Sequence, residues 1–323
     1  MASARLCAIG AVAPGIAFGH AAHAMPGLDL ARFGLPVEDS GAWFDARLML
    51  PGLKHRYLND TVRYGLAAAL RCRQSSGEEV TPERLGVFLG SAVADFSVRD
   101  QFDHALLANG SASLNTVSAP NISANITAAH VAIACLARAF STTLTSPFLA
   151  GFEGLYLGVQ ALRMGQCDQV LVIAAEEALP VDDDCSVVPG ALALQLSTDA
   201  DPEAGGRRLR TLCWARHCDQ SSGSTRLVNA VAALPPALLQ GARLVVLRDD
   251  STVAKELALH CGNAIHARFD AFGASKLMKE EIVLGGSGAL EPMLRAVHWL
   301  TVDHPIVLLA IHERRFLAFV IHR

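Results

Sequence analysis

The stretch STTLTSPFLAGFEGLYLGVQALRMGQCDQVLVIAAE, residues 141–176, predicts a strand, a sharp turn, a buried helix and a second strand. Its first five residues are short or β-branched, and residues 169–175 form an apolar run of strand length. In between, bulky residues recur at helical spacing on one face and small residues on another: Phe148, Phe152, Leu155, Val159 and Leu162, and Gly151, Gly154, Gly158 and Ala161. Such a helix is expected to be buried and closely approached by a second backbone.

The turn before this helix presents one side chain at the helix N-terminus. Ser146 and Pro147 suit a helix start, because serine caps helices and proline fits the first helical position. Helix N-termini stabilise negative charge, so many enzymes place a nucleophilic Ser or Cys there. The residue presented here is Phe148, which cannot act as a nucleophile.

Four segments, in the right order, resemble the β-ketoacyl synthases of the thiolase superfamily: LCAIGAVAP at residues 6–14, LGVFLGS at 85–91, the stretch 141–176, and SKLMKEEIVLGGSGALE at 275–291. The resemblance implies an α/β protein with a thiolase-like five-layered αβαβα fold built from two pseudo-repeated halves. It places an N-terminal half at residues 1–200 and a shortened C-terminal half at residues 201–323. The acidic, Pro- and Gly-rich segment 199–206 (DADPEAGG) is the expected boundary.

The residues that carry catalysis in this family are replaced. By the resemblance, Phe148 stands at the position of the nucleophilic Cys, Arg248 at that of the first histidine, and Glu281, a few residues after Lys276, at that of the second. The closing F-G-F-G-G loop is replaced by residues 311–315 (IHERR). Arginine stays protonated and cannot act as a base, and Glu281 is expected to pair with Lys276 or Arg248. We therefore expect a non-catalytic subunit that resembles the chain-length factors, the silent partners of ketosynthases in type II polyketide and aryl-polyene pathways.

The resemblance also implies how a silent subunit would act. It would form a heterodimer with a Cys-bearing β-ketoacyl synthase, shape that partner's acyl pocket, and meet the acyl carrier protein only indirectly, in polyketide, aryl-polyene or fatty-acid-type biosynthesis. The loop at residues 112–120, which contains Ser118, would reach towards the partner's pocket. The strand before Phe148 would pair across the two-fold axis, with interface residues Thr142, Thr143, Leu144 and Thr145.

Two alternatives stay open at this point. One is a thiolase-fold acyltransferase or hydrolase with a rebuilt site that uses Ser146 or a cysteine such as Cys167. A serine nucleophile needs a base within hydrogen-bond reach, however, and helix capping is the commoner role for Ser146. The other is a homodimeric protein that binds acyl groups. Loss of all three family catalytic residues favours the silent subunit.

Composition excludes several classes of protein. The net charge is −4 without a basic block, which argues against nucleic acid as a partner. The eight cysteines are scattered without C-x-x-C spacing, as expected for a cytoplasmic protein without a zinc site. The acidic run 182–184 is expected to be a solvated turn, so we expect no metal or cofactor. No apolar run reaches the ~18–20 residues of a membrane span, and the signal-like residues 6–18 are better explained as the first strand.

Periodicity and turn signals predict the remaining elements. Helices are expected at residues 61–72, 99–108, 124–139, 227–239, 252–261 and 289–300. Strands are expected at residues 6–13, 85–91, 190–197, 208–215, 243–247, 265–272, 306–311 and 316–321.

Overall fold

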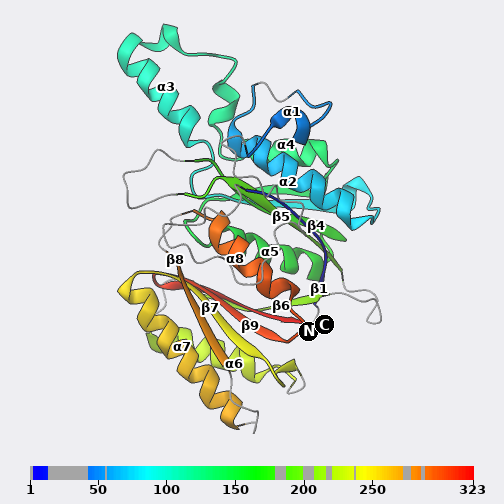
Figure 1. The fold of residues 1–323 in the computed structure, drawn as a ribbon, viewed down its shortest axis with the longest axis vertical. Coiled ribbons are helices and arrows are strands. Elements are labelled where there is room, and N and C mark those ends of the chain that lie inside the picture. Colours follow the sequence, from blue (N-terminus) through cyan, green and yellow to red (C-terminus); the bar gives the residue numbers. More distant parts are fainter. Residues whose placement is uncertain are drawn as a thin grey trace.

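The computed structural model describes residues 3–13, 43–54, 57–178, 187–198, 207–215, 220–235, 238–271, 278–284 and 288–323 (Figure 1). Ten strands of this part of the chain are hydrogen-bonded in the order β3-β2-β4-β5-β1-β6-β10-β9-β7-β8. Their bounds are Ala4–Val12 (β1), Leu85–Gly90 (β2), Phe140–Leu144 (β3), Gln169–Glu176 (β4), Gly190–Thr198 (β5), Arg207–Ala215 (β6), Arg243–Asp249 (β7), Met278–Leu284 (β8), Ile306–His312 (β9) and Arg315–His322 (β10).

The strand order repeats itself between the two halves of the chain. The first half runs β3-β2-β4-β5-β1 and the second runs β8-β7-β9-β10-β6. Each strand of the first half thus has a counterpart whose strand number is higher by five. The pairing directions agree as well, since β2 is parallel to β3 and β4, and β7 is parallel to β8 and β9. The two half-sheets meet where the first residues of β1 pair with β6. The two halves therefore have the same topology.

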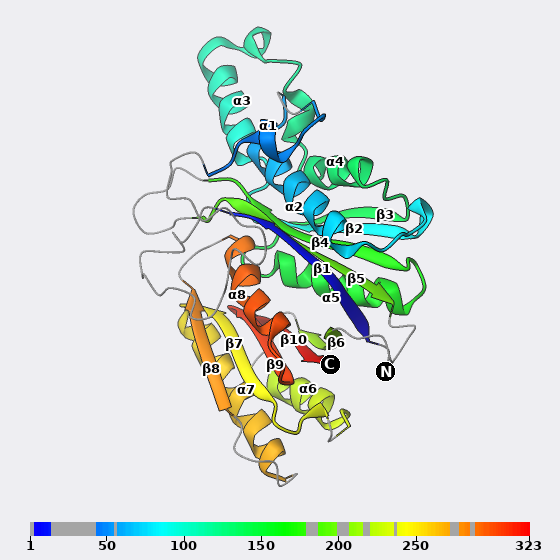
Figure 2. The same ribbon diagram turned by 45° about the vertical axis from the view of Figure 1, so that its right-hand side comes forward.

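Helices cover both faces of each half-sheet (Figure 2). Helices α2 and α4 lie on the outer face of the first half-sheet, α5 and α8 lie between the two, and α6 and α7 lie on the outer face of the second. The bounds are Ala46–Met49 (α1), Asp60–Ser76 (α2), Phe96–Asn109 (α3), Ile126–Ala134 (α4), Ala150–Arg163 (α5), Gln220–Ala232 (α6), Thr252–Ala271 (α7) and Leu290–Thr301 (α8), with 3-10 turns at Pro82–Arg84 (η2), Ser111–Ser113 (η3) and Ala119–Ile122 (η4). The mixed α/β prediction is confirmed.

The central helix α5 packs as its sequence predicts. Its bulky residues Phe152, Leu155 and Val159 are at most 1% exposed and belong to the core between the half-sheets. A Cβ atom on Gly154 or Gly158 would lie within 3.3 Å of Val172 on β4. The small face of α5 therefore lets the helix lie directly on β2 and β4.

Two predicted elements are wrong. The strand expected at residues 265–272 is wrong for residues 265–271, which form the second part of helix α7, because the buried residues Ile265 and Phe269 are four positions apart and lie on one helical face. Strand β8 was not expected, because Lys279, Glu280 and Glu281 interrupt its apolar pattern. Charges are tolerated there because β8 is an edge strand with one largely exposed face.

Two predicted helices have different ends. The helix expected at residues 124–139 ends at Ala134, since Leu136 has a positive φ of 56°. The helix expected at residues 227–239 begins at Gln220 and ends at Ala232, shortly before Pro235. The expected boundary at 199–206 lies outside the described residues.

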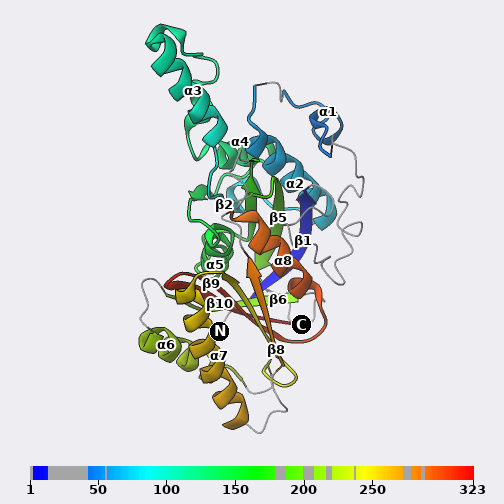
Figure 3. The same ribbon diagram turned by 60° about the vertical axis from the view of Figure 1, so that its left-hand side comes forward.

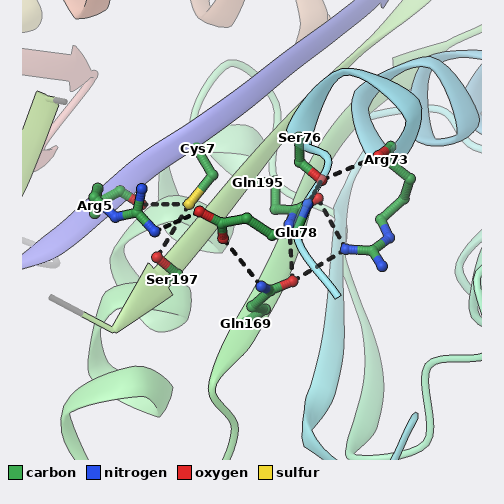
Figure 4. Close-up of polar contacts among 8 residues, drawn as sticks. All are labelled: Arg5, Cys7, Arg73, Ser76, Glu78, Gln169, Gln195 and Ser197. Atoms are coloured by element: carbon green, nitrogen blue, oxygen red, sulfur yellow. Dashed lines mark hydrogen bonds and ion pairs between the residues drawn. The ribbon is translucent and has the colours of Figure 1, made fainter. Parts of the chain in front are cut away.

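A buried polar network holds the end of α2 to the first half-sheet (Figure 4). Arg73 donates to the side-chain oxygens of Gln169 and Gln195, and the Gln169 amide donates to Glu78. Gln195 is fully buried. Each buried amide thus has partners, which fixes the register of α2 against β4 and β5.

We expect Gly90→Ala to destabilise the fold by about 1–3 kcal/mol, because the new methyl group would overpack the start of α5. A Cβ at Gly90 would lie 2.4 Å from the carbonyl carbon of Ala150, which is backbone and cannot rotate away. Gly262→Ala in α7 is the matched control, since its Cβ would meet nothing closer than 3.6 Å and alanine favours helix. Urea unfolding of both variants would measure the difference; equal stabilities would contradict the close approach.

Candidate functional site

The turn between β3 and α5 holds Phe148 in an unusual conformation. Its φ is +64°, a region that costs a non-glycine residue about 1–3 kcal/mol. The side chain is completely buried, and its ring stacks on His312 with 5.7 Å between ring centroids and 7° between planes. Phe148 therefore lies just before the N-terminus of the buried helix, as the sequence predicts. Its side chain points into the protein core.

Ser146 does not cap α5, so that prediction is wrong. The N-cap residue is Leu149, and the Ser146 hydroxyl donates instead to Oε2 of Glu153 at 2.7 Å. The Ser146 backbone carbonyl accepts a hydrogen bond from the first helical N–H group, that of Ala150, at 3.2 Å, so only its side chain is turned away from the helix start. Glu153 is 5% exposed and belongs to the first turn of α5, where the helix dipole favours a carboxylate.

His312 belongs to a second group of polar residues around Asp249. Nδ1 of His312 lies 2.5 Å from Oδ2 of Asp249, and the Ser251 hydroxyl donates to Oδ1 at 2.5 Å. The backbone N–H groups of Ser251 and Glu313 each donate to this carboxylate at 2.9 Å. Burial alone would raise the pKa of Asp249, but the His312 ring and these donors outweigh it and lower that pKa below its usual range. Asp249 is therefore a fixed anion that joins the ends of β7 and β9.

The expected ion pair between Arg248 and Glu281 is present. Nε of Arg248 donates to Oε1 of Glu281 at 2.6 Å, and Lys279 contacts the other carboxylate oxygen at 2.8 Å. Burial would raise the pKa of Glu281, but these two cations lower it. Arg248 is 7% exposed, so its partner compensates a buried charge. Lys276, the other expected partner, lies outside the described residues.

A cleft of about 730 Å³ opens beside Ser146 and Glu153. It is lined by the end of β3, by Ser146, Glu153 and Ser251, and by the turn between β9 and β10. Both serine hydroxyls donate to carboxylates, and neither donates to an imidazole. A carboxylate whose pKa is lowered, such as Asp249, is a poor base for the Ser251 hydroxyl.

Cys167 is unsuited to the alternative role of nucleophile. It follows the C-terminal end of α5, at the other end of the helix from Phe148. The side chain is completely buried, and burial raises the pKa of its thiol to about 11. A protonated, inaccessible thiol does not attack an acyl group.

The residues expected at a subunit interface lie at the edge of the first half-sheet. Strand β3, which contains Thr142, Thr143 and Leu144, is paired only with β2 in the described part of the chain. Thr142 and Thr145 are exposed. Ser118 precedes η4 in the loop after α3, and it is half-buried.

Sequence reasoning missed Glu153, Asp249, Ser251 and the contact of His312 with Phe148. One feature of the sequence could have indicated a role for His312: by the resemblance, it belongs to the segment 311–315 that stands in place of the closing loop. Among the described residues no group of three or more His, Cys, Asp or Glu side chains could hold a metal ion. The acidic run 182–184 lies outside them. No helix of the described segments is long and apolar enough to span a membrane.

Part of the chain is similar to a known protein family. Residues 37–187 match the family model described as Beta-ketoacyl synthase, N-terminal domain. This part of the chain is similar to the β-ketoacyl synthases. The 3-oxoacyl-[acyl-carrier-protein] synthase 2 of Vibrio cholerae serotype O1 is 22% identical over 138 residues, which cover 42% of this chain and 33% of that enzyme. The matched segment thus spans about a third of this ketosynthase relative.

Solved ketosynthase structures share the fold over the whole chain. A type II PKS acyl-carrier protein in complex with its ketosynthase bound to the hexaketide matches with a TM-score of 0.71 and 14% identity, covering 100% of this chain and 99% of that one. The ishigamide ketosynthase/chain length factor matches with a TM-score of 0.65 and 16% identity, covering 99% and 98%. A β-ketoacyl synthase from Burkholderia phymatum matches with a TM-score of 0.59 and 13% identity, covering both chains completely. At these identities the likeness establishes the fold.

We expect Asp249→Asn to lower the free energy of unfolding by about 1–3 kcal/mol at pH 7, because the amide replaces a buried carboxylate that accepts several hydrogen bonds. The lowered pKa means that the carboxylate stabilises the fold above the ordinary value of 3.8, and that this contribution is lost as the pH falls below it. The difference between wild type and variant, measured by urea unfolding, should therefore shrink from pH 7 towards pH 3. The exposed neighbour provides the control Asp250→Asn, and a difference independent of pH would contradict the assignment.

Proposed function

We propose that this chain is a non-catalytic, chain-length-factor-like subunit that forms a heterodimer with an active β-ketoacyl-ACP synthase and shapes its acyl pocket. The observation that carries the proposal is the buried, inert Phe148 at the turn before α5. The charged groups nearby are held in ion pairs and hydrogen bonds, and the Ser146 hydroxyl donates to a carboxylate, not to an imidazole. Phe148 would then fill the vestigial site, with Arg248, Glu281 and Lys276 as its degenerate positions.

The two edges of the sheet differ in a way that favours one of them as the interface. Strand β8 carries Lys279, Glu280 and Glu281, and charges on an edge strand discourage pairing with another chain. Strand β3 has no charged residue, and residues 139–152 around it have none. An exposed, uncharged edge is suited to pairing with a partner subunit. We propose that β3 pairs with the partner through Thr142, Thr143, Leu144 and Thr145.

The stretch of chain that precedes β3 supports the same choice. Residues 105–137, which include most of the exposed loop with Ser118, contain no Asp, Glu, Lys or Arg, although 18% of the whole chain is charged. Leu107, Val117, Ile133 and Leu136 are 85%, 59%, 72% and 59% exposed. A surface of this kind is typical of one covered by another protein.

The rest of the proposal follows from the family. The fold would be a thiolase-like five-layered αβαβα fold with an N-terminal half at residues 1–200 and a C-terminal half, residues 201–323, that is shortened relative to a full synthase. The complex would act in the cytoplasm on substrates attached to acyl carrier protein, in polyketide, aryl-polyene or fatty-acid-type biosynthesis. No cofactor or metal takes part in this role. The chain is expected to be poorly soluble without its partner, because its uncharged edge would be exposed.

Co-expression with the ketosynthase of the same pathway, followed by native mass spectrometry, tests the proposal. A one-to-one heterodimer that is active only with the partner's cysteine intact is the expected result. A self-sufficient homodimer labelled covalently by an acyl thioester would overturn it, and the labelled residue would identify the nucleophile of a rebuilt acyltransferase or hydrolase.

We expect Thr142→Lys to abolish the heterodimer, because it places an unpaired charge on the edge strand that would be covered. Thr142 is exposed in the free subunit, so its fold should be unaffected. Val283→Lys on β8, at a residue 47% exposed, is the matched control and should leave the complex intact. Loss of the complex in the control alone would point to β8 as the interface.

We expect Ser118→Trp to shorten the product of the complex, because the larger side chain would occupy part of the partner's acyl pocket. Chromatography and mass spectrometry of the products would measure chain length. Unchanged product length in a stable heterodimer would contradict the role of the loop at residues 112–120 in setting pocket depth.

A further inference from the structure

Helix α3 and the loop that follows it, residues 96–122, form an arm that projects from the molecule (Figure 3). The three ribbon views place α3 beyond the outer helix layer. Its one buried residue is Val98, whereas Phe96 and Leu107 are 40% and 85% exposed. It packs mainly against η3 and η4, which belong to the arm itself. A helix of this length with so little burial is marginally stable, so the order of the arm depends on how its base is held.

The base of the arm is held by a carboxylate from another element. Glu177, which directly follows β4 and is 2% exposed, accepts hydrogen bonds from the Ser97 N–H at 2.7 Å and the Ser97 hydroxyl at 2.6 Å. The N-cap residue Asp95 makes no capping hydrogen bond with its side chain. Glu177 thus supplies the cap that the local sequence does not, and its charge suits the helix N-terminus.

The neighbouring carboxylate connects this base to the C-terminal half. Glu176 is completely buried and accepts hydrogen bonds from the Ser91 hydroxyl at 2.9 Å and the Ala92 N–H at 2.6 Å, both just before the arm. It also accepts one at 2.7 Å from the N–H of Ala289, which precedes α8. The end of β4, the base of the arm and the start of α8 are therefore joined through two adjacent side chains.

We infer that the contact between Glu177 and Ser97 positions the arm for the partner ketosynthase and so contributes to the affinity of the heterodimer. This inference rests on the proposed function. If Glu177 did not hold the first turn of α3, that turn would have to become ordered when the partner binds, and this ordering would reduce the affinity. The uncharged stretch 105–137 begins within α3, so the direction of the helix decides where this surface meets the partner. The subunit's own fold depends little on the contact, since α3 buries so little.

The test compares Ser97→Ala with Ser97→Thr in the purified heterodimer. Ser97→Ala keeps the N–H bond to Glu177 but removes the hydroxyl bond, and should raise the dissociation constant about tenfold, the effect of losing one hydrogen bond to a charged group. Ser97→Thr keeps the hydroxyl and should restore the wild-type value. Ser75→Ala is the control, because the exposed Ser75 hydroxyl makes only a local bond to Arg71 in α2. Dissociation on dilution would be followed by native mass spectrometry, and hydrogen exchange of residues 96–100 should rise in Ser97→Ala alone.

Three results would overturn the inference: wild-type affinity in Ser97→Ala, equal losses in the Ala and Thr variants, or a loss in Ser97→Ala explained by a lower unfolding temperature of the whole subunit. Failure of the wild-type chain to bind any ketosynthase would instead contradict the proposed function. The two failures are distinguishable, since the first requires a wild-type heterodimer and the second excludes it.

Discussion

The strained turn at Phe148 is the constraint on which the arrangement of the two halves depends. A non-glycine residue at φ +64° is costly, and it persists here because the side chain is completely buried and stacked on His312. His312 in turn contacts Asp249, which is held by the chain around Ser251 and Glu313. The turn before α5 is therefore joined to the ends of β7 and β9 by packing and charge. In this chain the turn serves the core, because the side chain at its centre is buried between the two halves.

Three buried carboxylates each hold one part of the molecule to another by accepting hydrogen bonds. Asp249 joins elements of the C-terminal half, Glu176 joins the two halves at Ala289, and Glu177 holds the arm. Each is desolvated, and each accepts hydrogen bonds from backbone N–H groups that would otherwise be unpaired at loop or helix starts. These three carboxylates therefore have a structural role, since each holds the backbone of one element against another.

The contrast between the two edge strands illustrates how charge placement can direct assembly. The strands β3 and β8 hold equivalent positions in the repeated topology, yet one is uncharged and the other carries adjacent charges. Identical topology therefore offers two edges, and side-chain chemistry leaves one of them available for pairing. The part of the arm from residue 105 onwards is uncharged and precedes β3 in the chain, so both belong to one stretch, residues 105–152, whose single charged residue is Arg138.

The sequence by itself determined the α/β class, the buried helix α5 with its two faces, most strands, and the inert residue before that helix, because periodicity and residue size are local properties. It also predicted the pair of Arg248 with Glu281. The tertiary structure decided what local patterns do not contain: the true extent of α7, the exposed strand β8, and the partners of Ser146, His312 and Asp249. Those outcomes depend on contacts between residues far apart in the chain, where burial and neighbouring charges select one partner among several. The positive φ of Phe148 is of the same kind, since only packing from both halves compensates its strain.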